Sequence, residues 1–422
     1  MSGLKLLVSG ASIAGPATAY WLAKAGAQVT VVERFAALRT GGQAVDIRTA
    51  GVSVMRRMPG LEAAIRSKST QEEGISFVNQ DGKSFGVIRP SGNPDQQSLV
   101  SEYEILRGDL SKILFDVTND NKNIDYIFNE QIASISQSEK ADGPLTVTFA
   151  NGTAPSKYDL VVAGDGATSR TRVLGFGGHV RDPIVSTNCW AAYFSTSKDL
   201  LNGGKIGKGY SAVGGRNLSI GSDPAGFSRV LLMCLNQTPE EMKSFRDALA
   251  QGETATKNYI AQHYQGVGWK TDEAIPEMMD SIDFYASETV QVKTPTLHRG
   301  RFVLVGDAGY ASGLTGSGTS LALAGAYILA GELQKHGKDI EAGLRSYEQQ
   351  MRPLINKMQP IPPLVPTIMA PQTAWGIWLR NNIFWLIAQS GLIGFAQRFI
   401  AAGFGDAKEF PVPEYEWEWE NE

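Results

Sequence analysis

The segment Leu6–Glu33 constrains the fold more than any other part of the chain. It reads as an apolar strand, a glycine turn, a helix of small residues and a second apolar strand that ends at a carboxylate. Gly10 permits the tight turn after the strand, and Gly15 lets the helix pack close to the sheet. The helix N-terminus then presents free N–H groups and the positive end of its dipole, which together can bind a pyrophosphate. The segment therefore predicts a βαβ unit that binds a dinucleotide.

Residues around this turn are the expected ligand contacts. Glu33 follows the turn by about twenty residues, where a carboxylate can accept hydrogen bonds from both ribose hydroxyls. Ser12 replaces the middle glycine of G-x-G-x-x-G, so the backbone approaches the phosphate less freely. We expect further contacts from Ile13 and Ala14 in the turn and from Arg34 after the second strand. An ordinary strand–turn–helix unit without a ligand is the alternative.

Two later segments carry further glycine turns at the ends of apolar strands. Residues 158–172 read YDLVVAGDGATSRTR, and residues 299–333 contain a strand that ends at Gly306 and Asp307. A glycine-rich turn and a small-residue helix follow that aspartate. The first of these segments includes the pattern D-G-x-x-S-x-x-R, formed by Asp165, Gly166, Ser169 and Arg172. Three such motifs in this order indicate one dinucleotide site assembled from distant parts of the chain.

Together the three motifs, from Leu6 to about Leu333, resemble the single-component FAD-dependent aromatic hydroxylases, group A flavoprotein monooxygenases with the p-hydroxybenzoate hydroxylase fold. The resemblance implies an α/β (α+β) protein. A Rossmann-like FAD-binding domain would be interleaved with a substrate domain on a mixed β-sheet, and C-terminal helices would follow. The expected ranges are 1–73, 101–174 and 293–360 for FAD binding, 74–100 and 175–292 for the substrate, and 361–422 for a helical extension and acidic tail.

The resemblance also implies flavin contacts outside the first motif. Asp307 matches the residue that accepts hydrogen bonds from the ribityl hydroxyls, although an aspartate that caps the next turn would look the same. Gly316, Gly318 and Thr319 open the next helix, so their N–H groups are expected to face the electron-rich side of the flavin.

Two arginines and one aspartate complete the expected set. Arg48 follows a glycine loop and matches a position near the FAD phosphates. Arg107 begins an R-x-x-L pattern similar to the family's arginine beside the ribityl and phosphate groups, where a planar fork of donors suits the ligand. Asp165 is expected near the pyrophosphate, where it also holds its own loop. A surface arginine and a helix-start arginine are the alternatives for Arg48 and Arg107.

FAD carries out the chemistry in this family, so the resemblance predicts no catalytic side chain. It implies that NADPH or NADH reduces the flavin, which takes up O2 as a C4a-hydroperoxide. One oxygen atom then enters an aromatic, polyketide or alkaloid-like small molecule, and hydroxylation in natural-product metabolism is the expected outcome. Epoxidation, Baeyer–Villiger insertion and tetracycline-type inactivation are alternatives, and an FAD-binding protein without oxygenase activity is a more distant one.

One departure from the family keeps the type of oxidation open. The family often has G-D-A-A-H and a proline before the glycines, whereas residues 306–310 read GDAGY and no proline precedes Gly316. The W-x-W-x-I-P segment of flavin halogenases has no match in the chain, so we do not expect halogenation.

The sequence specifies the substrate poorly. Trp190, Tyr193, Phe194 and Arg216 lie in the presumed substrate sheet, where they could bind a ligand or belong to the core. Strand alternation places Trp190 and Phe194 on one face and Tyr193 on the other, without showing which face points inward. The glycine loop at 41–48 and the apolar C-terminus are similar to the tetracycline-inactivating branch of the family, in which an added helix covers a large pocket.

Composition excludes several other classes of protein. The 422 residues are 42% hydrophobic and 19% charged, as in a soluble globular protein of two or three domains. A net charge of −4 without a basic run argues against nucleic acid as a partner. Cys189 and Cys234 lack a metal-ligand spacing, and the four histidines are scattered. We therefore expect no metal and a reducing, cytoplasmic location.

The C-terminal region from Trp375 to Phe404 is rich in Trp, Phe, Ile and Leu. Charged and amide residues interrupt it, so no uncharged run reaches the roughly 18 residues of a spanning helix. Three roles stay open: a helix that covers the active site, a dimer surface, and a helix in a membrane interface. Either a monomer or a homodimer is therefore expected. The acidic residues 409–422 are expected to form a solvated tail.

Overall fold

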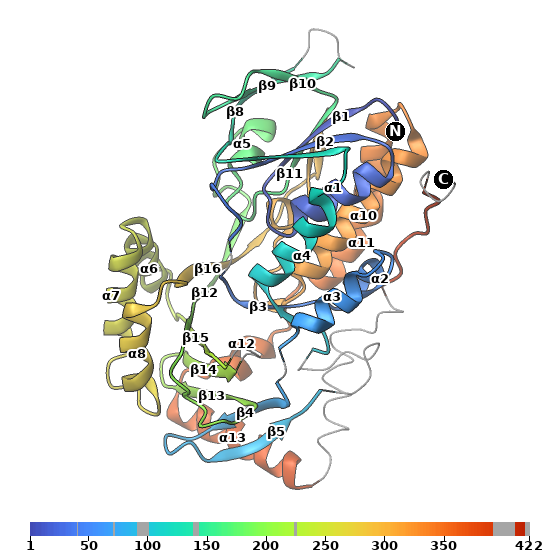
Figure 1. The fold of residues 1–422 in the computed structure, drawn as a ribbon. Coiled ribbons are helices and arrows are strands. Elements are labelled where there is room, and N and C mark those ends of the chain that lie inside the picture. The colour runs from blue at the N-terminus through green and yellow to red at the C-terminus, as the bar shows by residue number, and fades with distance from the viewer. Residues whose placement is uncertain are drawn as a thin grey trace.

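The computed structural model describes residues 1–39, 41–70, 72–90, 101–137, 143–222, 226–390 and 410–417. Its two larger sheets lie at different ends of the molecule, and helices pack on each (Figure 1). The first sheet has the strand order β17-β18-β11-β1-β2-β7, and the second has the order β16-β12-β15-β14-β13-β4-β5. Because β4 and β5 precede β7 in the chain, the polypeptide leaves the first sheet, enters the second and returns. This interleaving confirms the predicted α/β (α+β) fold.

The first sheet is parallel except at one edge, where β17 runs antiparallel to β18. Its strands β1, β11 and β18 are nearly continuous apolar runs, as expected of strands that are buried on both faces. Leu6 and Val8 face the core cluster that includes α1 and α10, and Leu7 faces the opposite cluster. The strands are β1 (Lys5–Ser9), β2 (Gln28–Glu33), β7 (Ile124–Phe128), β11 (Leu160–Ala163), β17 (His298–Arg299) and β18 (Phe302–Leu304).

Small residues bring α1 (Ala14–Lys24) and α10 (Gly318–His336) together on one face of this sheet. Gly325 in α10 has no room for a side chain, because a Cβ there would collide with the Tyr310 hydroxyl. The other helical elements near the first sheet are α2 (Ala50–Arg56), α3 (Leu61–Lys68), α4 (Arg107–Asn119), α5 (Arg170–Phe176), α9 (Asp307–Tyr310), η1 (Gly313–Thr315) and α11 (Ile340–Met358).

Helix α11 continues through Pro353 to Met358. A proline inside a helix lacks the N–H for one i→i−4 hydrogen bond. Here the turns after the proline bury Leu354, Ile355 and Met358, so tertiary packing holds them in helical conformation.

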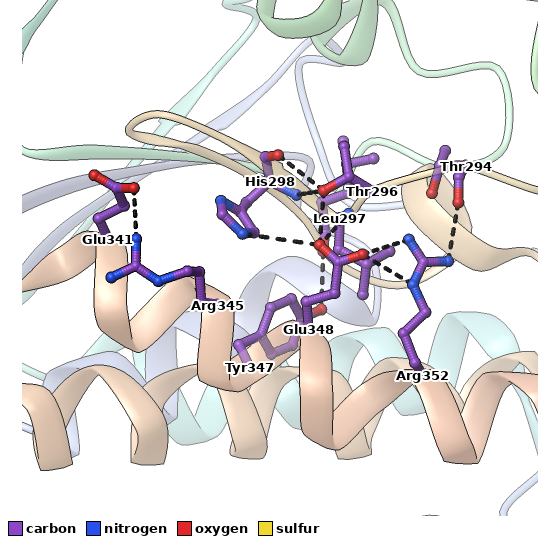
Figure 2. Close-up of polar contacts among 10 residues, drawn as sticks. Thr294, Thr296, Leu297, His298, Glu341, Arg345, Tyr347, Glu348 and Arg352 are labelled. Atoms are coloured by element: carbon purple, nitrogen blue, oxygen red, sulfur yellow. Dashed lines mark hydrogen bonds and ion pairs between the residues drawn. The ribbon is translucent and has the colours of Figure 1, made fainter.

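A polar network ties α11 to the segment that leads into β18 (Figure 2). Glu348 accepts hydrogen bonds from Thr296 Oγ1 at 2.7 Å and from the Leu297 N–H at 3.0 Å. Its other oxygen binds Arg352 at 2.6 and 2.9 Å, and Arg352 also donates to the Thr294 carbonyl at 2.9 Å. Burial by itself would raise the pKa of Glu348, but the hydrogen bonds outweigh burial and lower the pKa overall.

The second sheet is antiparallel except where β4 joins β13 in parallel. Residues 74–88 alternate in sequence around a turn at Asp81 and Gly82, and they form the hairpin of β4 and β5. The helices on one face are α6 (Pro239–Ala250), α7 (Glu253–His263) and α8 (Thr271–Asp280). The strands are β4 (Gly74–Val78), β5 (Ser84–Ile88), β12 (Ile184–Thr196), β13 (Ile206–Ala212), β14 (Arg216–Ser222), β15 (Ser228–Leu235) and β16 (Tyr285–Val292).

Residues 124–158 contribute strands to two different sheets. Strand β7 joins the first sheet parallel to β2, because its buried Ile124 extends the core beneath that sheet. The next strands do pair antiparallel, in a separate sheet of β8 (Ile132–Ser136), β9 (Leu145–Phe149) and β10 (Ser156–Tyr158). A short antiparallel ladder of β3 (Ala44–Asp46) and β6 (Glu104–Leu106) lies between the two larger sheets.

The C-terminal helices α12 (Leu364–Met369) and α13 (Ala374–Gln389) lie by the second sheet (Figure 1). Phe384 of α13 meets Phe77 of β4 edge-on, with ring centroids 5.4 Å apart. The predicted C-terminal apolar segment continues into residues 391–409, which lie outside the described residues. Among the described helices, none is long and apolar enough to cross a membrane.

The expected solvated tail is wrong for residues 410–417. Phe410, Val412 and Trp417 are buried, and the Trp417 ring lies 4.8 Å from that of Trp21. Tyr415 donates a hydrogen bond to Glu332 at 2.7 Å. Apolar and aromatic residues alternate with exposed glutamates and prolines in this segment, so its acidic composition conceals an apolar side.

Replacing Glu348 with alanine should lower the free energy of unfolding by about 2 kcal/mol, because Arg352 and the Leu297 N–H lose their partner. Urea denaturation measures this loss. Glu341→Ala is the matched control in the same helix, since its pair with Arg345 is exposed and contributes about 0.5 kcal/mol or less. Equal losses in both variants would contradict the role of the network.

Trp417→Ala should lower the free energy of unfolding by about 3 kcal/mol, because it removes a buried indole that packs on Trp21. Thermal unfolding followed by circular dichroism measures the effect. Glu416→Ala next to it alters an exposed side chain and should change stability by about 0.5 kcal/mol at most. An unaltered melting temperature in Trp417→Ala would show that the tail is not packed in solution.

Candidate active site

The turn between β1 and α1 lies at the carboxyl end of the first sheet's central strands. Gly10 has a φ of +101°, and a Cβ there would lie 2.8 Å from the Gly164 carbonyl oxygen. A Cβ at Gly15 would collide with the carbonyl oxygen of Gly10. Both positions therefore require glycine. Between them lie Ser12, which is half-buried, and the buried residues Ile13 and Ala14.

Glu33 stands at the end of β2 and binds this turn. Its Oε2 accepts a hydrogen bond from the Ala11 N–H at 2.8 Å, and its Oε1 accepts one from the Phe35 N–H at 3.1 Å. Arg34 is exposed, with its guanidinium 4.7 Å from the centre of the Phe35 ring. A carboxylate beside the glycine turn is where a dinucleotide fold holds a ribose.

Asp165 and Arg172 form hydrogen bonds that stabilise the loop after β11 and its contact with α9. The Asp165 carboxylate accepts hydrogen bonds from the Ser169 hydroxyl and from both the N–H and the hydroxyl of Thr171. Arg172 is buried and donates to the Ala308 carbonyl at 2.7 Å and to two carbonyls near its own helix. The D-G-x-x-S-x-x-R motif thus joins the loop after β11 to the helix that Asp307 begins, and Asp165 acts within that loop.

Asp307 begins α9 next to the start of α10. Its carboxyl group is accessible to solvent, although protein surrounds it on most sides. A Cβ at Gly318 would lie 3.4 Å from Asp307 Oδ1. The surrounding protein raises the pKa of Asp307, and the nearby Arg107 guanidinium opposes that rise. The structure therefore brings Asp307, Arg107 and Gly318 together from three helix starts.

The glycine loop at 41–48 lies beside the same helix starts. The Arg107 N–H donates to the Gln43 carbonyl at 2.9 Å. The Arg48 N–H donates to Ser320 Oγ at 2.8 Å. Three segments that are far apart in the sequence thus meet at one place. They are the glycine loop, the helix that begins at Arg107 and the glycine-rich start of α10.

Asp46 holds the Arg48 side chain near the N-terminus of α10. The Arg48 guanidinium lies 2.8 Å from Asp46 Oδ2, and its side chain is 12% exposed. A Cβ at Gly316, whose φ is +71°, would lie 3.9 Å from the same carboxylate oxygen. Thr319 follows as a buried residue in the first turn of α10. This placement argues against Arg48 as an ordinary surface arginine.

These features fit FAD. The glycine turn brings backbone N–H groups close to a helix N-terminus, as a pyrophosphate requires. Glu33 offers carboxylate oxygens at the end of β2, and Asp307 offers an accessible carboxyl group beside a cation. The donors and acceptors therefore lie along one edge of the first sheet, in the order that a long dinucleotide needs.

A cavity of about 310 Å³ lies between the second sheet and the β3–β6 ladder. Its wall includes residues 42–44 of the glycine loop, so the cavity borders the loop that meets Arg107. Its volume lies at the lower end of the range for small-molecule sites. On the sheet side, Tyr193, Leu231 and Ser219 form one row of paired positions.

Glycines form the floor of this cavity. Gly207 and Gly209 of β13 occupy positions on the same face of the strand, and Gly209 pairs with Ser219. A Cβ at Gly209 would lie 3.4 Å from Ser219 Oγ, an ordinary van der Waals contact. The cavity is therefore open over Gly209. Sequence reasoning missed this floor, although glycine spaced by two in a strand signals close approach of a ligand or another chain segment.

Two carboxylates on the cavity wall were also missed. Burial, together with the charge of Glu104, raises the pKa of Glu72 to about 8. Burial likewise raises the pKa of Glu104, with a further rise from Asp46, and Glu104 accepts a hydrogen bond from Thr70 Oγ1 at 2.9 Å. Isolated glutamates between strands look like surface residues in a sequence, so no signal marked them.

The four predicted substrate residues separate into different environments. Tyr193 lines the cavity, with its ring 6.5 Å from that of Tyr285. Trp190 lies on the opposite face, stacked on Phe245 at 4.9 Å in the core beneath the helices. Phe194 borders the cavity, but its side chain belongs to that same core.

Arg216 also acts away from the cavity. Its guanidinium donates to the Val213 carbonyl at 3.0 Å and to the His263 carbonyl at 2.9 Å, which ties β14 to the end of α7. Of the four, Tyr193 is therefore the side chain placed to touch a ligand.

Comparison with known proteins identifies the family. Residues 4–359 match the family described as an FAD binding domain. The FAD-dependent monooxygenase asL4 of Sarocladium schorii is 33% identical over 421 residues, which cover 92% of this chain and 93% of that protein. Monooxygenase CTB7 of Cercospora beticola is 32% identical, with 99% and 98% covered. The crystal structure of tetracycline destructase Tet(51) has a TM-score of 0.77 at 28% identity, covering 98% of this chain and 100% of that one. The chain therefore belongs to the FAD-binding family of flavin-dependent monooxygenases.

Proposed function

We propose that this monooxygenase uses NADPH or NADH to place one oxygen atom from O2 on a flat, aromatic small molecule, with hydroxylation as the outcome. One observation carries the proposal. Residues 42–44 line the cavity, and the same loop contacts Arg107, which lies beside Asp307. A ligand in the cavity would therefore meet the reactive end of a flavin held by Asp307 and Arg107.

FAD, when bound, supplies the electron transfer and the activation of O2. The chain's own residues bind and orient it. The glycine turn and Glu33 would hold the adenosine and pyrophosphate, and Asp307 would accept hydrogen bonds from the ribityl hydroxyls. The dipole of α10 would stabilise negative charge at its N-terminus. Other proposed flavin contacts are Ser12, Ile13, Ala14, Arg34, Arg48, Arg107, Asp165, Gly316, Gly318 and Thr319.

The shape of the cavity favours a flat, polycyclic substrate. Gly209 on the sheet floor lets a ring system approach the backbone closely, and Tyr193 adds an aromatic ring to the same face. Leu231 in the next strand gives an apolar surface that excludes water from the reacting atoms. A structural neighbour named for tetracycline, a ligand with fused rings, supports this size class.

Both cysteines are buried in the second sheet. Cys189 and Cys234 are free thiols, and burial raises the pKa of each to about 12, so neither is prone to oxidation. We place the protein in the cytoplasm, acting as a monomer or a homodimer.

Asp307→Ala should lower FAD occupancy at least about tenfold, because it removes a charge-assisted acceptor for the ribityl hydroxyls. Flavin absorbance per mole of purified protein measures occupancy. Asp116→Asn is a suitable control, since Asp116 forms an exposed pair with Lys112 in α4. Full, tightly retained FAD in Asp307→Ala would remove Asp307 from the flavin site.

Flat aromatic compounds should raise NADPH consumption by the FAD-loaded protein and yield a product that carries one atom from heavy-isotope O2. Mass spectrometry of the product is the measurement. Gly209→Val projects a side chain into the cavity and should raise KM about tenfold or more without changing FAD content. NADPH consumption that yields only hydrogen peroxide across a broad panel of such compounds would favour an FAD protein without oxygenase activity.

A further inference from the structure

The Glu72 carboxylate lies directly on the glycine floor of the cavity. A Cβ at Gly207 would lie 2.8 Å from Glu72 Oε2, and a Cβ at Gly221 would collide with Oε1. The two glycines, on adjacent strands β13 and β14, therefore leave the space that this carboxylate occupies. The floor is shaped for Glu72 at one end and is open above Gly209.

A second carboxylate, that of Glu104, affects the ionisation of Glu72. Glu104 lines the same cavity, and its charge raises the pKa of Glu72. Asp46 pairs with Glu104 across the β3–β6 ladder, so negative groups collect on this side of the cavity. Each carboxylate opposes the ionisation of the others, and the Arg48 guanidinium offsets part of this effect at Asp46 and Glu104.

The cations near the cavity either pair with other carboxylates or lie on the far face of the sheet. Arg229 lies 3.4 Å from Asp283, and Arg48 lies 2.8 Å from Asp46. Lys208 stands between Gly207 and Gly209, so strand alternation places its side chain on the face away from the floor. The space over Gly209 therefore borders two carboxyl groups that a bound cation would help to ionise.

We propose that Glu72, with Glu104 behind it, is the specificity-determining group of the cavity and selects flat aromatic substrates that carry a protonated amine. The inference rests on the proposed function and names its substrate class. A protonated nitrogen beside Glu72 would relieve the repulsion between the two carboxylates and form a charge-assisted hydrogen bond. A neutral ring gains neither effect, and an aromatic carboxylate would add a third negative charge.

Three probes with one ring system separate these cases. They are 9-aminoacridine, a cation at neutral pH, acridine, which is neutral, and acridine-9-carboxylate, an anion. Isothermal titration calorimetry with the FAD-loaded protein gives the affinity of each without requiring turnover. The expected order in the wild type is cation, then neutral compound, then anion, with the cation at least about tenfold tighter than the neutral compound.

Glu72→Gln keeps the shape of the side chain and removes its capacity to ionise when a cation binds beside it. It should weaken 9-aminoacridine about tenfold and leave acridine unchanged. Glu240→Gln, an exposed position in the outer helix α6, makes the same substitution and should alter neither affinity. If Glu72→Gln fails to fold, the order of the three probes on the wild type still decides the matter.

Equal affinities of the cation and the neutral compound for the wild type would overturn the inference. So would an equal loss for all three probes in a folded, FAD-loaded Glu72→Gln. Turnover assays on the same samples show whether the inference about charge selection or the proposed oxygenase function has failed. Oxygenation of flat compounds without charge preference removes the inference alone, whereas charge preference without any oxygenation upholds it and contradicts the proposed function.

Discussion

The buried guanidinium of Arg172 holds together the parts from which the active site is built. Its hydrogen bond to the Ala308 carbonyl fixes the loop after β11 against the helix that Asp307 begins. That loop in turn packs on the glycine turn, since Gly10 approaches the Gly164 carbonyl so closely that a side chain would not fit. Because the strands of the first sheet are parallel, their carboxyl ends bring these turns to one edge. The placement of Asp307 relative to Glu33 depends on this packing.

The cavity shows a different way of making a site. Its floor is formed by Gly207, Gly209 and Gly221, which have no side chains. Its polar groups include Glu72 and Glu104, which lie outside the second sheet. The β3–β6 ladder supplies Glu104, and its strand β3 belongs to the glycine loop that contacts Arg107. Under the proposed function, one short ladder would therefore contact both the substrate and the flavin.

Sequence reasoning succeeds where a residue's role follows from local geometry. The glycine turn, the hairpin at Asp81 and Gly82 and the helix that begins at Arg107 each have a local signal. It fails where the role depends on which side of an element is covered. Strand alternation correctly placed Trp190 and Tyr193 on opposite faces of the sheet. It could not show which face is covered, because the helices that bury Trp190 come from residues 239–280. The packed tail was missed for the same reason, because the surface that receives Trp417 lies on α1.

A crystal structure of the FAD complex would show whether the three distant motifs form one flavin site that borders the cavity. We expect the adenosine ribose at Glu33, the ribityl chain at Asp307 and the flavin ring at residues 42–44, with its edge open to the glycine floor. A flavin bound elsewhere, or a ring separated from the cavity by protein, would contradict this expectation.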